Sequence, residues 1–444
     1  MTSGWLAGVA VRDITPTRGL HLAGFAAREQ PALGVHDPLA VRVIAIGDGT
    51  RTAAIAVVDL IGVDSAITGG VRDRVRDALG DALQYVAVVG THTHGGPAVL
   101  RRALLGEIDD AYVEELVTRI ADGVVAAYTD RAPVVVRYGL GQERTVGKNR
   151  RDPGGVIDPA LPVIRFDDAE SGRPRALLCS YACHPVTLGP ENRAYTPDYP
   201  GYLVDRLSGA CDRAPVVFLT GCCAQINTGH SAMDSIVGRG LERRTFAEAE
   251  RIGGVLAGTA AHTAHRIAPP GGTPDALPAA SLVTASMRTT LPLAPVGRPD
   301  PAAIAALERA AAELAGDASR YGEAVMASAH LRWARTHDAA VRQVDTEVAV
   351  IALGDVVIVL MPGEIFVEFG LELKRRFPHL HLVTVSYAND AIGYVPHRTA
   401  YEVGGYEVDM AYRHYGFAGP YAVDAGEALV ASVSSLLEHV GGAA

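Results

Sequence analysis

Short apolar runs alternate with amphipathic stretches along most of the chain. Alternating and β-branched apolar positions predict strands, whereas apolar positions three and four residues apart predict helices. The predicted strands are Val41–Ile46, Thr52–Val58, Tyr85–Val89, Val134–Tyr138, Arg175–Tyr181, Pro215–Leu219, Glu347–Leu353, Val356–Leu360 and Leu382–Ser386. The predicted helices are Ile67–Leu79, Asp109–Tyr128, Tyr199–Leu207, Thr245–His265 and Phe366–Phe377, with further Ala- and Glu-rich helices within Pro301–Thr336. Strands that alternate with helices in this way indicate an α/β fold with mixed β-sheets and flanking helices.

A unit of strand, loop, helix and strand occurs three times, and polar residues follow strand ends in each unit. The polar clusters are Thr91-His92-Thr93-His94 in the first unit, Cys183-His184-Pro185 in the second and Pro362-Gly363-Glu364 in the third. The second unit then leads into Gly221–Asn227, and the third into Asn389–Tyr394. Ligands of α/β sheets collect beyond the carboxyl ends of strands, so these clusters are the candidate site.

We expect residues 1–444 to form a single catalytic domain. A Gly- and Pro-rich stretch at Ala268–Pro278 separates two sub-halves, 1–267 and 279–444, and Leu291–Pro301 is a second candidate linker.

Composition excludes several classes of protein. The formal net charge of −10 argues against nucleic-acid binding, which needs a basic surface to neutralise phosphates. Neither a signal peptide nor an apolar run long enough to cross a bilayer is apparent, so we expect a cytoplasmic protein without an integral membrane segment. The five cysteines indicate reduced thiols, although their clustering leaves a structural metal site as an alternative. Oligomeric state cannot be inferred from these patterns.

The histidines and carboxylates at the strand ends allow more than one interpretation. His92 and His94 flank one threonine, so an extended backbone would aim both imidazoles the same way, although two unrelated loop histidines would look identical. His184 follows an apolar strand, where a histidine is more often a hydrogen-bonded structural residue than a ligand. Asp198 could support a ligand or cap the helix that follows it.

Glu364 directly follows the apolar run Val356–Leu360, where an unpaired charge would be costly. Either a metal ion or an arginine would satisfy it. Tyr394 fits an ordinary packed aromatic equally well. The sequence contains no H-E-x-x-H helix, no Walker loop and no G-x-S-x-G elbow.

Taken together, these segments resemble the neutral/alkaline non-lysosomal ceramidase family along nearly the whole chain. Thr91-His92-Thr93-His94-Gly95-Gly96-Pro97 is close to the family's T-H-T-H-S-G-P, its most specific motif. Tyrosines 394, 401 and 406 keep the family's spacing of seven and five. Further matches are Gly8–Pro16 with G-x-x-x-x-D-I-T, Ala23-Gly24-Phe25 with M-G-Y, Gly34–Asp37 with G-I-H, Lys148–Pro153 with N-R-S-P and Pro362-Gly363-Glu364 with P-G-E. The similarity is to the catalytic domain of the shorter bacterial members, without a C-terminal β-sandwich.

This resemblance implies a ceramidase-like domain with one Zn²⁺ per chain at the strand ends. Carried over residue by residue, the zinc ligands would be His92, His184, Glu364 and Tyr394. His94, Arg150 and Tyr406 would face the scissile carbonyl, and Asp198, Asn227 and Asn389 would support the ligands or bind substrate. Imidazoles, a carboxylate and a phenolate suit Zn²⁺ and leave a position for a water molecule, which zinc activates near neutral pH.

Two departures from the family pattern concern the site. His184 lies in a Cys-His-Pro context where the family has H-G-T-S-M, and Gln225 stands where the family's G-D-V-S-P-N loop has an acid. The predicted function is a zinc-dependent hydrolase that cleaves an amide bond of a small or medium-sized N-acyl substrate through metal-activated water. The alternatives are a metal-dependent esterase or lactonase and a non-catalytic binding protein on the same fold.

Overall fold

The computed structural model describes residues 4–101, 106–238, 240–268, 276–277, 280–336, 338 and 340–441. Most of the predicted linker Ala268–Pro278 therefore lies outside the described residues.

Strands and helices alternate through most of the structure. The strands are β1 (Trp5–Asp13), β2 (Gly34–Val35), β3 (Ala40–Gly47), β4 (Thr52–Val58), β5 (Tyr85–Gly90), β6 (Ala132–Gln142), β7 (Lys148–Asn149), β8 (Ala160–Asp168), β9 (Pro174–Tyr181), β10 (Ala194–Tyr195), β11 (Val216–Thr220), β12 (Ile226–Asn227), β13 (Leu282–Pro292), β14 (Gln343–Leu353), β15 (Val356–Leu360), β16 (Glu364–Ile365), β17 (His381–Val385) and β18 (Tyr394–Val395). The helices are α1 (Ser65–Leu79), α2 (Asp110–Thr129), α3 (Tyr199–Ala210), α4 (Ala232–Val237), α5 (Phe246–Arg266), α6 (Pro301–Leu314), α7 (Tyr321–Thr336), α8 (Val367–Arg376), α9 (Thr399–Val403), α10 (Ala411–His414) and α11 (Ala425–Gly441), with a π-helical turn at Tyr406–Met410.

Two mixed sheets form the centre of the fold, which confirms the predicted class. The larger sheet has eight strands in the order β11-β9-β8-β6-β1-β3-β4-β5, and the smaller has four in the order β13-β14-β15-β17. The pairs β4/β5, β9/β11 and β15/β17 are parallel, and each corresponds to one of the three repeated units in the sequence. All three pairs lie at sheet edges, and the remaining neighbours in these sheets are antiparallel.

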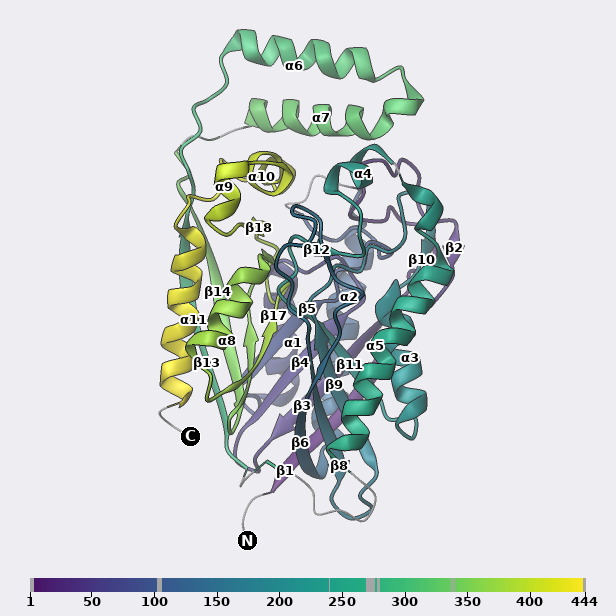
Figure 1. Ribbon diagram of the computed structural model, residues 1–444, viewed down its shortest axis with the longest axis vertical. Helices are drawn as coiled ribbons and strands as arrows, with labels where there is room; N and C mark the ends of the chain where they lie inside the picture. The colour runs from purple at the N-terminus through teal and green to yellow at the C-terminus, as the bar shows by residue number, and fades with distance from the viewer. Residues whose placement is uncertain are drawn as a thin grey trace.

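The two sheets pack face to face between two helical layers (Figure 1). Ile44 and Ile55 of the larger sheet share one buried cluster with Ile351 and Ile358 of the smaller sheet. Helices α1, α2, α3 and α5 cover the outer face of the larger sheet, and α8 and α11 cover that of the smaller. Strands with both faces buried become continuously apolar, which explains why β4 and β15 are recognisable in the sequence with their correct ends.

Helices α6 and α7 form a hairpin at one end of the molecule, next to α4, α9 and α10 in Figure 1. This hairpin is the helical content predicted within Pro301–Thr336. The indole Nε1 of Trp333 donates to the carbonyl oxygen of Phe417 at 2.7 Å, which ties α7 to the segment that follows α10. The second candidate linker, Leu291–Pro301, begins inside β13 and ends at the first residue of α6.

Strands β1, β8 and β13 and helix α11 were not predicted. In β1, Gly8 interrupts the apolar alternation because the backbone of α2 lies against it. A Cβ on Gly8 would lie 2.2 Å from the carbonyl oxygen of Ala127, so only glycine fits there. Strand β13 is partly exposed at the edge of the smaller sheet. Its many polar residues leave no regular alternation of apolar and polar positions in the sequence.

None of the helices in the described part of the chain has the length and hydrophobicity that a membrane span requires.

We expect Phe369→Ala to lower the free energy of unfolding by about 3–5 kcal/mol, the usual cost of deleting a buried aromatic ring. Phe369 of α8 is fully buried, and its ring lies where a Cβ on Gly426 of α11 would fall, so its loss leaves a void between the two helices. Urea unfolding measures the change, and Val403→Ala, at an 81% exposed side chain, is the control. A loss below about 1 kcal/mol would contradict this packing.

Candidate metal centre

The carboxyl ends of the three parallel units converge on one point. The residues after β17 join the two edges of the larger sheet. There the backbone N–H of Ser386 donates to Thr220 at 3.0 Å, and the N–H of Gly90 donates to the carbonyl oxygen of Tyr387 at 3.1 Å. The loops after β5, β9 and β15 therefore begin side by side, and they carry His92, His184 and Glu364.

His92 lies two residues beyond β5 with a φ of 68°, a left-handed conformation that is strained for a residue with a Cβ. Its ring stacks on Tyr387 with 3.9 Å between ring centroids. Its Nδ1 lies 2.6 Å from the carbonyl oxygen of Ile61. Because a carbonyl oxygen can only accept, Nδ1 carries the proton and Nε2 faces the centre of the cluster.

His184 is held in the same manner from the opposite edge of the sheet. Its Nδ1 donates to the carbonyl oxygen of Cys223 at 2.8 Å, and its Nε2 lies 3.0 Å from Oε2 of Glu364. Burial lowers the pKa of His184 to about 4, although the bond to Glu364 acts in the opposite direction. The imidazole is therefore neutral near pH 7, with a lone pair on Nε2.

Glu364 completes the cluster. Its Oε2 also lies 3.5 Å from Nε2 of His92, and its Oε1 accepts a hydrogen bond from the hydroxyl of Tyr415. Burial acts to raise the pKa of Glu364, but His92 and His184 outweigh it and hold the pKa well below its usual range. The side chain is therefore a carboxylate although it is 3% exposed.

The three side chains each offer a ligand atom, and these atoms lie within 4.8 Å of one another. Two imidazole nitrogens whose other nitrogens donate to backbone carbonyls, together with a carboxylate, form a donor set that suits a divalent cation such as zinc. Among the described residues, this is the group of three or more His, Cys, Asp and Glu side chains close enough to share an ion, and it contains no cysteine. The five cysteines are buried free thiols, as the sequence predicted.

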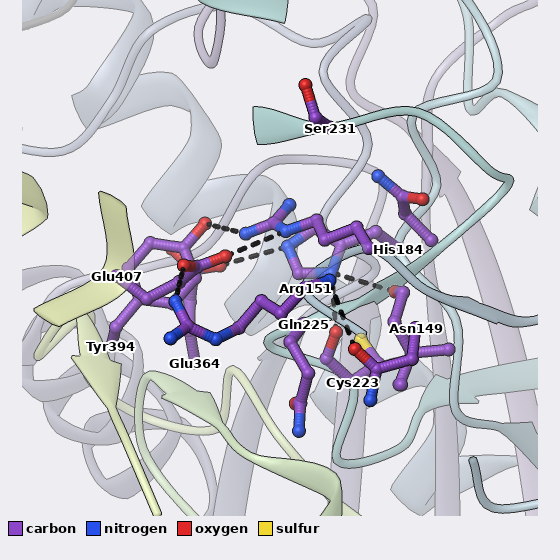
Figure 2. A network of polar contacts seen from close by, with 12 residues as sticks. Asn149, Arg151, His184, Cys223, Gln225, Ser231, Glu364, Tyr394 and Glu407 are labelled. Carbon is purple, nitrogen blue, oxygen red and sulfur yellow. Dashed lines mark hydrogen bonds and ion pairs between the residues drawn. The ribbon is translucent and has the colours of Figure 1, made fainter. Parts of the chain in front are cut away.

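Tyr394 lies beside the cluster because β16 and β18 pair in parallel, with Glu364 opposite Tyr394. Its hydroxyl oxygen accepts from a terminal nitrogen of Arg150 at 3.2 Å. Glu407 in turn binds Nε of Arg150 at 2.9 Å and Arg151 at 2.5 Å, the group of charges drawn in Figure 2. Burial and then Glu364 raise the pKa of Tyr394 well above its usual value, whereas Arg150 acts to lower it. The side chain is therefore a neutral phenol unless a cation lies nearby.

A narrow cavity of about 50 Å³ opens beside the cluster. Its lining includes Ala23, Gly24, Ile61, His92, His94, Ala98, Leu100, Glu364, Tyr394, Tyr406, His414 and Tyr415. His94 and Tyr406 thus line the cavity, whereas Arg150 is not among the lining residues and contacts the hydroxyl of Tyr394. That these three residues face a scissile carbonyl stays a prediction. Both ring nitrogens of His94 are buried without a hydrogen-bond partner, and burial lowers its pKa well below the usual value.

The three predicted supporting residues do not touch the ligand atoms. Asp198 caps α3 by accepting from the N–H of Tyr199, and it also accepts from Leu188 in the loop after His184. The side-chain amide of Asn227 donates to the carbonyl oxygen of His230 and accepts from the N–H of Gly229, which holds the turn between Asn227 and His230. Asn389 binds Tyr85 and the backbone of β5. Helix capping, the alternative interpretation of Asp198, is what its contacts show, and a substrate-binding role for these residues stays a prediction.

Four residues at the centre were not predicted as site residues: Tyr387, Glu407, His414 and Tyr415. Glu407 directly follows Tyr406, the last tyrosine of the spaced set 394, 401 and 406, so that set could have indicated it. Tyr387 follows the strand Leu382–Ser386, but an aromatic residue after a strand is not a specific signal. No helical period of apolar residues marks His414 and Tyr415 in the sequence. The π-helical turn before them has only five residues, and α10 has only four.

Gln225, which stands in place of an acid, has both ends of its side-chain amide paired. Its Oε1 accepts from the N–H of Val367 at 3.2 Å, and its Nε2 donates to Glu368 at 2.6 Å. An acid at this position would face the carboxylate of Glu368. Glutamine therefore fits the neighbouring helix α8, and this departure leaves the three ligand atoms in place.

We expect Gln225→Glu to lower the free energy of unfolding by about 1–3 kcal/mol, because it replaces a donor with a carboxylate that repels Glu368. The double variant Gln225→Glu/Glu368→Gln should recover most of the loss. Urea unfolding of the three proteins measures both effects. Equal stability of the single variant and the wild type would contradict the contact.

His414 gives the fold a predicted pH dependence. Burial and then Arg413 lower the pKa of His414 to about 4, whereas an unfolded histidine titrates near 6.5. As the pH falls from 6.5 towards 4, the unfolded chain takes up this proton first, so the folded state loses about 2 kcal/mol by pH 5. We expect His414→Gln to remove this loss, measured as the change in unfolding free energy between pH 7.5 and pH 5. Parallel losses in both proteins would show that His414 does not contribute.

Three comparisons relate the chain to known proteins. A family model described as neutral/alkaline non-lysosomal ceramidase, N-terminal, matches residues 5–140. Neutral ceramidase 3 of Arabidopsis thaliana is 26% identical over 174 residues, which are 37% of this chain and 24% of that relative. Neutral ceramidase of Oryza sativa subsp. japonica is 26% identical over 223 residues, covering 45% of this chain and 28% of that relative. The matched part thus spans about a quarter of the length of these curated relatives.

The fold matches solved structures over nearly the whole chain. Neutral ceramidase from Pseudomonas aeruginosa superposes with a TM-score of 0.73 at 17% identity, covering 99% of this chain and 74% of that one. A second structure, described as ceramidase complexed with C2, gives a TM-score of 0.69 at 16% identity and covers 99% of this chain and 75% of that one. The chain is thus similar to the neutral/alkaline ceramidase family over residues 5–140, and it shares the fold of these two solved structures over nearly its whole length.

Proposed function

We propose that the chain is a zinc-dependent hydrolase that cleaves an amide bond of a small or medium-sized N-acyl compound. The observation that carries the proposal is the convergence of two imidazole Nε2 atoms and the Glu364 carboxylate at the wall of a cavity. The ligand atoms lie within 4.8 Å of one another and all three side chains are buried, an arrangement that suits a bound divalent cation. The relatives are named ceramidases, and a ceramide is an N-acyl compound, which supports the bond class.

In this proposal His92, His184 and Glu364 hold the ion and Tyr394 lies in position to be the fourth ligand. Zinc bound by nitrogen and oxygen ligands polarises a carbonyl group and acidifies water near neutral pH. Arg150 favours the ionised form of Tyr394 by donating to its oxygen, and Glu407 fixes Arg150 for that contact. The ligands come from both sides of residues 268–278, so the proposal treats the chain as one catalytic domain.

His94 is the residue best placed to move a proton. Its ring lies on the cavity wall, 5.2 Å from the ring of His92 between centroids, and neither nitrogen is occupied by another group. A neutral imidazole can accept a proton from the attacking water and return it to the leaving nitrogen. The hydroxyl of Tyr406 can donate a hydrogen bond to the developing oxyanion from the same cavity.

We expect the purified wild-type protein to hold one zinc per chain by elemental analysis. His92→Ala, His184→Ala and Glu364→Ala should each lose it, because each removes one of three converging donors. His381→Ala is the matched control, since His381 is an exposed histidine outside the cluster. A wild-type protein that stays metal-free after incubation with zinc would contradict the proposal and favour a binding protein.

The same proteins also test the reaction. Each is assayed on an amide and on an ester that carry the same acyl group. We expect the wild type and His381→Ala to hydrolyse the amide, and the three ligand variants to lose roughly 10²–10³-fold or more in kcat/KM. Hydrolysis of the ester alone would replace the amidase proposal with an esterase or lactonase.

A further inference from the structure

The two carboxylate oxygens of Glu364 have different partners. Oε2 lies 3.0 Å from Nε2 of His184 and 3.5 Å from Nε2 of His92. Oε1 accepts a hydrogen bond from the hydroxyl of Tyr415, because an ionised carboxylate can only accept. An ion bound by the two imidazoles would therefore meet Oε2, while Oε1 is already engaged by Tyr415.

Close contacts fix the ring of Tyr415. It lies nearly parallel to the ring of Phe417, with 6.2 Å between centroids, and edge-on to the ring of Tyr394 at 6.4 Å. A Cβ on Gly393 would lie 3.0 Å from Cδ2 of Tyr415, so the ring lies against this glycine. The N–H of Glu364 donates to the carbonyl oxygen of Gly393 at 2.8 Å. Tyr415 and the backbone of Glu364 are thus both held at Gly393, which fixes the hydroxyl relative to the carboxylate.

Packing alone does not account for this hydroxyl. A phenylalanine at position 415 would keep the ring contacts, but it would remove the hydrogen bond to Oε1 of a carboxylate that is only 3% exposed. A buried charged group that loses a hydrogen-bond partner must find another or remain at a high cost. A metal ion beside Oε2 would be such a partner for Oε1.

A carboxylate binds a metal ion through one oxygen or through both. The choice matters in a hydrolytic centre, because a catalytic zinc ion keeps one coordination position for water beside its protein ligands. A second oxygen from Glu364 would compete with water for that position. Charge-assisted hydrogen bonds are roughly twice as strong as neutral ones, so Oε1 would lose a strong contact with Tyr415 if it turned to the ion.

We propose that Tyr415 is a positioning residue that limits Glu364 to binding the metal ion through Oε2 alone. The hydroxyl of Tyr415 holds Oε1, and the coordination position that Oε1 would otherwise take stays open to water. The inference rests on the metal centre of the proposed function, and it does not depend on which bond the protein hydrolyses.

The test is Tyr415→Phe, loaded with Co²⁺ in place of zinc. Co²⁺ binds nitrogen and oxygen donors as zinc does, and its visible absorption weakens as its coordination number rises. We expect one Co²⁺ per chain in the variant and in the wild type. The absorption per ion should be weaker in the variant, because the freed Oε1 becomes an additional ligand.

Tyr112→Phe is the matched control. Tyr112 is a buried tyrosine of α2, and its hydroxyl donates to the backbone carbonyl of Ile14 at 2.7 Å, outside the metal centre. The control removes the same atom from a buried hydrogen bond, so its cobalt spectrum should equal that of the wild type.

The kinetic effect should fall on kcat. On an amide that the wild type hydrolyses, we expect Tyr415→Phe to lower kcat by about 10- to 100-fold with little change in KM. Its zinc content should stay at one per chain, so an empty centre would not explain the loss.

An unchanged cobalt spectrum in Tyr415→Phe would overturn the inference and leave Tyr415 as a packing residue. Loss of the ion from this variant would overturn it too, because Tyr415 would then hold Glu364 in place without setting how it binds. If the variant does not fold, a crystal structure of the zinc-loaded wild type decides. We expect one Glu364 oxygen at about 2.0–2.2 Å from the ion and Oε1 still bonded to Tyr415, whereas two oxygens on the ion would overturn the inference.

The metal measurements need no substrate, so they separate this inference from the proposed reaction. A wild type that binds metal and hydrolyses no amide would refute the reaction alone. A wild type that binds neither zinc nor cobalt would refute the proposed function, and the inference with it.

Discussion

The charge of Glu364 is the constraint on which the rest of the centre depends. A carboxylate removed from water requires partners for its oxygen atoms, and here Tyr415 serves Oε1 while His92 and His184 face Oε2. These partners come from the loops after β5 and β9 and from the residue after α10. The buried charge therefore requires both sheets and the C-terminal segment to meet at one point, and a fold that separated them would leave it unpaired.

The backbone around this point carries strain that only such a convergence can stabilise. His92, Tyr387 and Asn389 have φ values of 68°, 60° and 64°, and left-handed conformations of this kind cost about 1–3 kcal/mol each. Hydrogen bonds from the neighbouring sheet hold them: the N–H of His92 donates to Leu60, and that of Asn389 to Val88. Asn389 thus supports the centre through the backbone of β5, although it touches no ligand atom.

Burial on both faces of a strand accounts for most of the fold that could be predicted from the sequence. The ends of Thr52–Val58 and Val356–Leu360 agree with the structure because every side chain in these strands is buried, and the three parallel units were recognised from the same runs. The positions of His92, His184 and Glu364 after those strands could be inferred in the same way. The segment after β18 could not, because a π-helical turn and a single turn of α-helix have no apolar period, yet they place Tyr406, His414 and Tyr415 on one cavity. The contact of Arg150 with Tyr394 depends on Glu407, which binds Arg150 from 257 residues away in the chain.

Ile61 connects the ligand geometry to the shape of the cavity. Its carbonyl oxygen accepts from Nδ1 of His92 and so fixes which imidazole nitrogen faces the cluster, and Ile61 is also part of the cavity lining. A change at Ile61 that moved its backbone would alter both the tautomer of His92 and the shape of the cavity.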